Sequence, residues 1–159
     1  MIILAGYIPT PEGLAAVDAA VAQAQRDNAR LVVVNAGHHG NYSDPNFAEG
    51  RDLDALEKQL AASGVPHEVR QPTEDTAAGD SILAAAREVG ADLIVIGLRR
   101  RSPVGKLITG STAQAILLNA DCPVVGVKPQ MRSTGRPQHD AAQDVPQTWA
   151  ATKPGVEIE

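Results

Sequence analysis

The sequence predicts a doubly wound α/β domain with a mainly parallel sheet of five strands and helices on both faces. Short, nearly continuous apolar runs alternate with segments of helical periodicity, and a last apolar run closes the series. Strands that crossover helices bury on both faces show this continuous apolar pattern. Right-handed crossovers are expected, in a Rossmann-like arrangement with the strand order 3-2-1-4-5.

The first two strands flank one long helix. "IILAGY" (2–7) is a short apolar run bounded by "PTPEG", which predicts a buried strand. Thr10 and Pro11 fit the N-cap and the first position of a helix over residues 11–28. "RLVVVNAG" (30–37) predicts the second strand. The apolar face of the helix is expected at Leu14, Val17, Val21 and Ala24.

The central part of the chain predicts a loop, a helix and a more polar strand. "HHGNYSDPNFAEG" (38–50) is dominated by loop-forming residues, and leucines at helical spacing place a helix over about 50–62. "HEVRQ" (67–71) predicts a third strand near a sheet edge, with His67 on its surface. The two adjacent histidines that open the loop lack a partner at metal-ligand spacing, so a metal site there is not expected. These histidines are His38 and His39.

The last part repeats the pattern twice. An apolar periodicity ending at Gly90 predicts a third helix, for which Asp75 and Asp80 fit a capping role. "DLIVIG" (92–97) predicts the fourth strand. "STAQAILLNA" predicts the fourth helix, and "PVVGVKP", from Pro123 to Pro129, the fifth strand.

Length and charge bound the class of protein. The chain has 159 residues and a formal net charge of −5, which suits one domain and argues against a nucleic-acid partner. We expect this domain at residues 1–130. Residues 131–159 are rich in Pro, Gln, Ser, Thr and Asp without periodicity, and predict a disordered polar tail. Trp149 in that tail fits either a solvated residue or a residue that docks on a surface.

Cysteine use and hydropathy indicate a cytoplasmic protein. Cys122 is the single cysteine, so no internal disulfide can form. It precedes an apolar run and is expected to be a packed thiol; a redox role would lack a second cysteine to resolve it. No apolar stretch approaches the length of a membrane span, and the N-terminus lacks the basic region of a signal peptide.

The loop "GLRRRSPVGKLITGS" (97–111) is the strongest candidate for a binding site. It begins at the carboxyl end of a strand and ends at a helix N-terminus, where free amides favour phosphate and Ser111 can cap the helix or donate its hydroxyl. The P-loop pattern fails because Leu107 follows Gly105-Lys106, and the three-glycine dinucleotide pattern is absent after the first strand. Two interpretations stay open: the loop cations meet an anion, or they are a solvated charged loop. These cations are Arg99, Arg100, Arg101 and Lys106.

The segment from "ADLIVIG" to "DCPVVGVKP" resembles the C-terminal half of a universal stress protein domain, and "LAAVDAAVAQAQRDNARLVVVNA" resembles its first helix and second strand. Nucleotide-binding members of that family carry a glycine, two residues, a glycine, nine residues, and a glycine followed by serine or threonine. Gly97 matches the first glycine, and Gly110 with Ser111 match the end at the right spacing. The resemblance covers about residues 1–129.

This resemblance implies a regulatory protein that binds ATP or another adenine nucleotide, with Mg²⁺ as a possible companion of the nucleotide. Gly97, Gly110, Ser111 and Thr112 are then expected to contact phosphate and ribose. The cations Arg99, Arg100 and Lys106 are expected to neutralise charge. Tyr7 and Ile8, at the end of the first strand, are expected to contact the nucleotide through backbone groups.

Two positions depart from the family pattern. Arg100 replaces the second motif glycine, and Ile8 stands where ATP-binding members usually have an aspartate that helps to hold adenine. The resemblance also implies a homodimer through the last strand, Pro123 to Pro129, and an unidentified protein partner. An apolar edge strand needs covering, so such a dimer is physically sensible as well.

Two alternatives to nucleotide-dependent regulation remain. One is a dimeric stress-response module that has lost its nucleotide, which Ile8 and Arg100 favour. The weaker one is a slow ATPase: hydrolysis needs a carboxylate near the phosphates, and the sequence places neither Asp92 nor Asp121 there. No nucleophile–base pair can be identified from the sequence, so we expect no catalytic residues.

Overall fold

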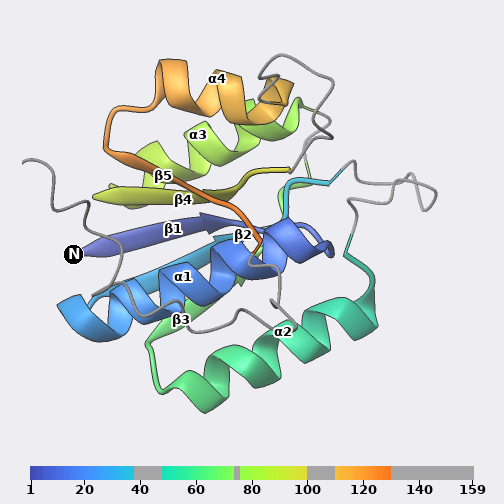
Figure 1. The fold of residues 1–159 in the computed structure, drawn as a ribbon, viewed down its shortest axis with the longest axis vertical. Helices are drawn as coiled ribbons and strands as arrows, with labels where there is room; N and C mark the ends of the chain where they lie inside the picture. Colours follow the sequence, from blue (N-terminus) through green and yellow to red (C-terminus); the bar gives the residue numbers. More distant parts are fainter. Residues whose placement is uncertain (38–47, 74–75, 100–109, 130–159) are drawn as a thin grey trace, which may run out of the picture.

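The computed structural model describes residues 1–37, 48–73, 76–99 and 110–129. Within these residues the chain forms the predicted doubly wound domain (Figure 1). A five-stranded sheet has the order β3-β2-β1-β4-β5, and all four neighbouring pairs are parallel. Both the strand order and the fold class predicted from the sequence are confirmed.

The strands and helices alternate along the chain as predicted. The strands are β1 (Ile2–Gly6), β2 (Arg30–Val34), β3 (His67–Arg70), β4 (Leu93–Gly97) and β5 (Val124–Val127). The helices are α1 (Pro11–Asp27), α2 (Gly50–Ser63), α3 (Ala78–Val89) and α4 (Ser111–Asn119). Several strands are shorter than their apolar runs, and β2 ends at Val34 rather than at residue 37.

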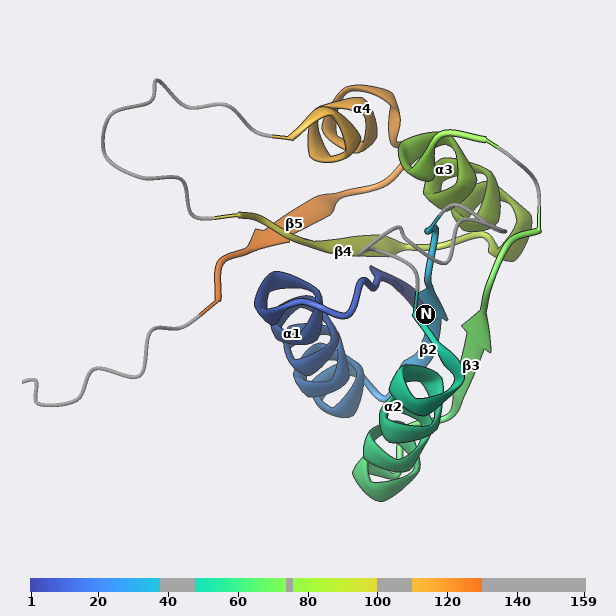
Figure 2. The same ribbon diagram turned by 90° about the vertical axis from the view of Figure 1, so that its right-hand side faces the viewer.

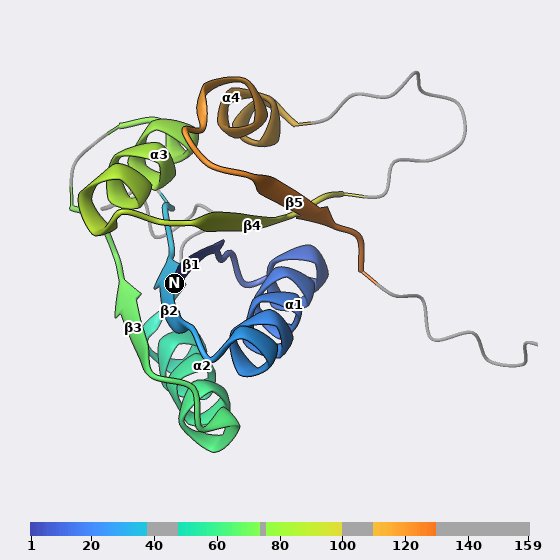
Figure 3. The same ribbon diagram turned by 90° about the vertical axis from the view of Figure 1, so that its left-hand side faces the viewer.

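Two layers of helices cover the sheet. α1 and α2 lie on one side and α3 and α4 on the other, as Figures 2 and 3 show from opposite directions. Alternate residues of β1 divide between the two resulting cores: Ile3 and Ala5 face α1 and α2, whereas Leu4 faces α3 and α4. All three side chains are completely buried. Burial on both sides explains why the central strands are continuously apolar.

Helix α1 packs on the sheet through small residues. Thr10 is its N-cap, as predicted, and the Oγ1 atom accepts a hydrogen bond from the Gly13 amide at 3.3 Å. Leu14 was expected on the buried face but is 43% exposed. That expectation is wrong because the helix approaches the sheet through residues that are glycine, alanine or valine, which rotates its buried face away from Leu14. The buried residues are Gly13, Ala16, Val17, Ala20 and Ala24.

Two local predictions require correction, and a third is not tested. The side chain of His67 is only 18% exposed and lies 3.0 Å from the Glu57 carboxylate, so it is not a solvated surface residue. Asp80 lies inside the first turn of α3, where it can stabilise the helix dipole, but the N-cap is Ala77. Asp75 lies outside the described residues.

Candidate functional site

The carboxyl ends of β1 and β4 form the point where the strand order reverses. β1 pairs with β2 on one side and with β4 on the other, so the connections after β1 and β4 leave toward opposite faces. Ligands of doubly wound sheets bind beyond the strand ends at such a point. β4 ends at Gly97, where the segment that the sequence predicted as the binding site begins (Figure 1).

Gly97, the last residue of β4, meets the first turn of α1. A Cβ atom at this position would lie 2.2 Å from the Glu12 carbonyl oxygen and 2.5 Å from the Glu12 carbonyl carbon. Any larger residue would therefore push α1 away from the sheet. Gly97 has a packing reason to be glycine that does not depend on a ligand.

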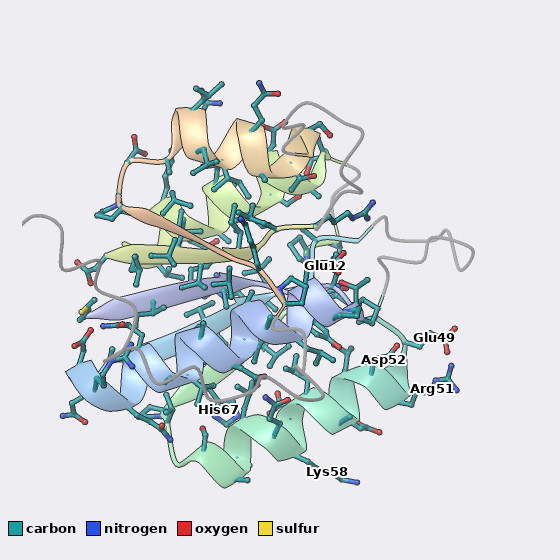
Figure 4. All side chains as sticks on the ribbon, viewed as in Figure 1. Glu12, Glu49, Arg51, Asp52, Lys58 and His67 are labelled. Carbon is teal, nitrogen blue, oxygen red and sulfur yellow. The ribbon has the colours of Figure 1, made fainter. Side chains whose placement is uncertain are left out.

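Glu12 brings a carboxylate to the same place. Its Oε1 atom lies 3.3 Å from Nε of Arg99, and the two side chains are 14% and 60% exposed, respectively. Glu12 lies at the N-terminal end of α1, beside the edge where β1 and β4 end (Figure 4). Sequence reasoning missed this residue, because its only signal was an acidic position in a first helical turn.

Gly110 and the two residues after it form the open N-terminus of α4. Gly110 is the N-cap, with φ −55° and ψ 153°, and as a glycine it supplies no capping side chain of its own. A Cβ atom on Gly110 would meet nothing within 4 Å among the described residues. Ser111 and Thr112 are exposed. The capping role considered for Ser111 is therefore wrong, since Ser111 occupies the first helical position and Gly110 is the N-cap.

Several predicted site residues lie outside the described residues. These are Arg100, Arg101 and Lys106, and their proposed roles stay predictions. His38 and His39, at which no metal site was expected, also lie outside the described residues. Among the described loop cations, Arg99 is the one whose contact is known.

Tyr7 and Ile8 occupy the end of β1 in different ways. The Tyr7 side chain is 4% exposed within the core on the α1 and α2 side. Burial raises the pKa of its phenol, and the nearby Asp52 charge raises the pKa further. The Tyr7 amide donates to Val34 O at 2.8 Å. Ile8 is half-buried, and its carbonyl accepts from the Thr10 amide at 2.8 Å.

The buried side-chain amide of Asn35 forms hydrogen bonds to the segments beside the end of β1. Asn35 is completely buried, and its Nδ2 atom donates to Tyr7 O at 2.9 Å. Its Oδ1 atom accepts from the Ala48 amide at 3.3 Å and from Gln71 Nε2 at 3.0 Å. Asn35 thus connects the ends of β1 and β2 with the segment before α2 and the segment after β3. These hydrogen bonds hold the four segments together at the carboxyl edge of the sheet.

The remaining candidate groups do not build a second site. Cys122 is half-buried and packs against the core on the α3 and α4 side. Burial raises its pKa, and so do the charges of Asp121 and Asp92, which keeps the thiol protonated. In the described ranges no group of three or more His, Cys, Asp or Glu side chains could hold a metal ion. None of the helices there combines the length and hydropathy of a membrane span.

Comparison with known proteins agrees with the geometry. Residues 1–128 match the universal stress protein family. A universal stress protein of Mycolicibacterium smegmatis is 42% identical over 127 residues, which cover 80% of this chain and 97% of the relative. One from Thermus aquaticus is 37% identical over 134 residues, with coverage of 79% and 97%.

Solved structures of universal stress proteins share the fold. One from Archaeoglobus fulgidus has a TM-score of 0.58 and 26% identity, and covers 80% of this chain and 97% of its own. One in complex with cAMP has a TM-score of 0.68 and 23% identity, with coverage of 82% and 98%. An A. fulgidus protein in complex with dAMP has a TM-score of 0.56 and 21% identity, with coverage of 80% and 96%. On its family match and its curated relatives, this chain belongs to the universal stress protein family.

Proposed function

We propose that this protein is a small regulatory protein that binds an adenine nucleotide at the carboxyl edge between β1, β4 and α4. The N-terminus of α4 carries the proposal: Gly110, Ser111 and Thr112 are exposed among the described residues, and their amides, with the hydroxyls of Ser111 and Thr112, stand at the family's motif position. The solved proteins of the same fold in complex with cAMP and dAMP support it.

Each part of the nucleotide has a proposed partner. The amides and hydroxyls of residues 110–112 bind phosphate, and Arg99 supplies a charged contact beside them. Arg100 and Lys106 stay predicted contributors. With Ile8 in place of the family's aspartate, adenine recognition relies on apolar contact and backbone groups rather than on a carboxylate.

Mg²⁺ fits this site only as a companion of the nucleotide. Glu12 is the carboxylate that the described residues place at the start of the loop, and it already pairs with Arg99. Mg²⁺ is commonly held by substrate phosphates, water and one or two carboxylates. The phosphates of a bound ATP, together with water, would therefore supply most of its ligands.

We also propose a homodimer through β5. This strand is at the sheet edge, between α4 and α1 (Figure 3), and its two central residues, Val125 and Gly126, are exposed. Val125 is 45% exposed. The opposite edge strand, β3, carries Glu68 between Arg30 and Arg70 in ion pairs. Charged edges resist strand pairing and apolar edges invite it, which favours β5 as the dimer edge.

We expect binding without turnover. Hydrolysis needs a group that positions water near the phosphates, and the Glu12 carboxylate at the start of the loop is instead paired with Arg99. A cytoplasmic location stays a prediction from cysteine use.

A dimeric module that has lost its nucleotide is the second candidate, because tight packing gives Gly97 a role that needs no ligand.

Calorimetric titration with AMP, cAMP and ATP tests the proposal. Gly110→Trp places a bulky side chain on the N-terminus of α4, at a position where an added Cβ atom meets nothing within 4 Å among the described residues. Gly50→Trp is the matched control, since Gly50 also opens a helix and a Cβ atom added there would meet nothing within 4 Å. Saturable binding in the wild type and in Gly50→Trp, lost in Gly110→Trp, supports the site. No binding of any of the three nucleotides by the wild type favours the module without nucleotide.

A further inference from the structure

Glu12 is fixed at the end of β4, where the loop of the proposed nucleotide site begins. The backbone of Glu12 packs against Gly97 so closely that no Cβ atom fits between them. The first turn of α1 therefore cannot move away from the end of β4 without losing this contact. Thr10 caps that turn and Pro11 occupies its first position. The Glu12 side chain, 14% exposed, is held far more closely than the Arg99 side chain, 60% exposed, that it pairs with.

The two helix N-termini at the carboxyl edge, those of α1 and α4, differ in charge. Glu12 is the acidic residue in the first turn of α1, whereas the first turn of α4 has none. A carboxylate 3.3 Å from Arg99 neutralises the described cation of the loop. A phosphate that approaches Arg99 must therefore share it with Glu12 and also meets the repulsion of the Glu12 charge. A triphosphate meets more repulsion than a monophosphate, because it carries more negative charge.

We propose that Glu12, by neutralising Arg99, lowers the affinity of this site for nucleoside triphosphates more than its affinity for monophosphates, so that the pair acts as a charge filter. The proposal rests on the adenine-nucleotide site proposed above and names the ligand class that the site selects. The ratio of ATP to AMP affinity should follow the net charge of the pair. The pair is neutral in the wild type, positive when Glu12 loses its charge, and negative when Arg99 loses its charge.

Four proteins test the filter: the wild type, Glu12→Gln, Arg99→Gln and the double variant, each titrated calorimetrically with AMP and with ATP without magnesium. Glu12→Gln keeps the shape of the side chain, and we expect it to raise the ratio of ATP to AMP affinity about three- to fivefold, the size of one partly exposed charge interaction. Arg99→Gln is expected to lower this ratio, and the double variant to return it toward the wild-type value. The differences should shrink at high salt.

A matched control separates the filter from a general effect of net charge. Asp121 forms an ion pair with Arg87 at 2.8 Å, also on the surface, near the C-terminal ends of α3 and α4. Asp121→Asn changes the net charge of the protein as Glu12→Gln does, and should leave the ratio unchanged. Thermal unfolding of each variant confirms that it is folded.

The outcomes distinguish the two proposals. Binding of AMP and ATP with the same ratio in the wild type and in Glu12→Gln overturns the filter and leaves the nucleotide site standing. An equal rise in Asp121→Asn also overturns it. Absence of binding in both the wild type and Glu12→Gln overturns the nucleotide site and the filter together.

Discussion

At the carboxyl edge of the sheet, one motif glycine is needed for packing and another is open to a ligand. Gly97 and Gly110 belong to the same family motif, yet their surroundings differ. Gly97 leaves no room for a Cβ atom, whereas a Cβ atom on Gly110 meets nothing among the described residues. Neither has a positive φ; in the described chain the glycines that do are Gly64 and Gly90. Glycine is therefore needed at Gly97 for close packing, and the openness of Gly110 fits the close approach of a ligand.

Gly97→Ala should destabilise the fold by about 1–3 kcal/mol, the usual cost of overpacking, because its methyl group would collide with the backbone of Glu12. Urea unfolding measures the change. Gly50→Ala adds the same methyl group in open space at the start of α2, and is expected to be neutral or slightly stabilising. Equal stability of wild type and Gly97→Ala would show that α1 does not pack on the end of β4 in this way.

His67 makes stability depend on pH. The Val65 carbonyl, 2.9 Å from Nδ1, is the main cause that raises its pKa, and Glu57 adds to it against the opposing effect of burial. A group with a raised folded pKa stabilises the fold below its unfolded value, 6.5, and loses that contribution as pH rises through the folded value. Wild-type stability should therefore fall relative to His67→Gln as pH rises across this window. Parallel pH profiles of urea unfolding for the two proteins would contradict the raised pKa.

At the scale of elements, one side chain joins segments that are distant in sequence. Asn35 contacts Tyr7, Ala48 and Gln71, which come from three different connections at the carboxyl edge. The asparagine satisfies backbone groups that the end of β1 and the segment before α2 would otherwise bury unpaired. It positions the edge on which the nucleotide site is built.

Asn35→Ala should cost about 1–3 kcal/mol, because it leaves the Tyr7 carbonyl and the Ala48 amide without this partner in a buried place. Gln59→Ala is the control: it removes an exposed hydrogen bond to Asp18 of 2.6 Å and should change stability little. Chemical denaturation of both variants measures the change in the free energy of unfolding. Equal losses of stability in the two variants would show that Asn35 does not hold these segments together.

The sequence predicted the elements better than the contacts among them. Continuous apolar runs and capping residues such as Thr10 are local signals, and they placed the nine elements of the described ranges in the correct order. Leu14 was misplaced because helical spacing alone does not say which side of α1 approaches the sheet. The contact between Asn35 and Gln71 escaped notice because it depends on the parallel register of β2 and β3. The contact between Glu12 and Arg99 depends on the packing of α1 against the end of β4.

At the scale of the whole molecule, the two edges of the sheet differ in chemistry. β5 exposes Val125 beside the layers of α1 and α4, on which Leu14, Leu117 and Leu118 are also exposed. β3 instead carries a network of Arg30, Glu68, Arg70 and Glu88. An apolar edge of this kind is a liability in a monomer.

Val125→Lys should convert a wild-type dimer to a monomer at micromolar concentration, because the charge would be buried without a partner between two β5 strands. Ala55→Lys, on the exposed side of α2, adds the same charge elsewhere and should leave the dimer intact. Sedimentation velocity reports the outcome. A monomeric wild type, or dimers that persist in Val125→Lys, would rule out association through β5.

The most direct test of the account is an NMR titration of the protein labelled with ¹⁵N. Increasing AMP should shift the amides of Gly97, Gly110, Ser111 and Thr112 along saturable curves that share one dissociation constant. Amides at the amino ends of the strands, such as Asp121, should stay unchanged. That result would place the nucleotide between the end of β4 and the start of α4. Saturable shifts confined to other surfaces, or no shifts at millimolar AMP, would contradict the claim that this edge is a nucleotide site.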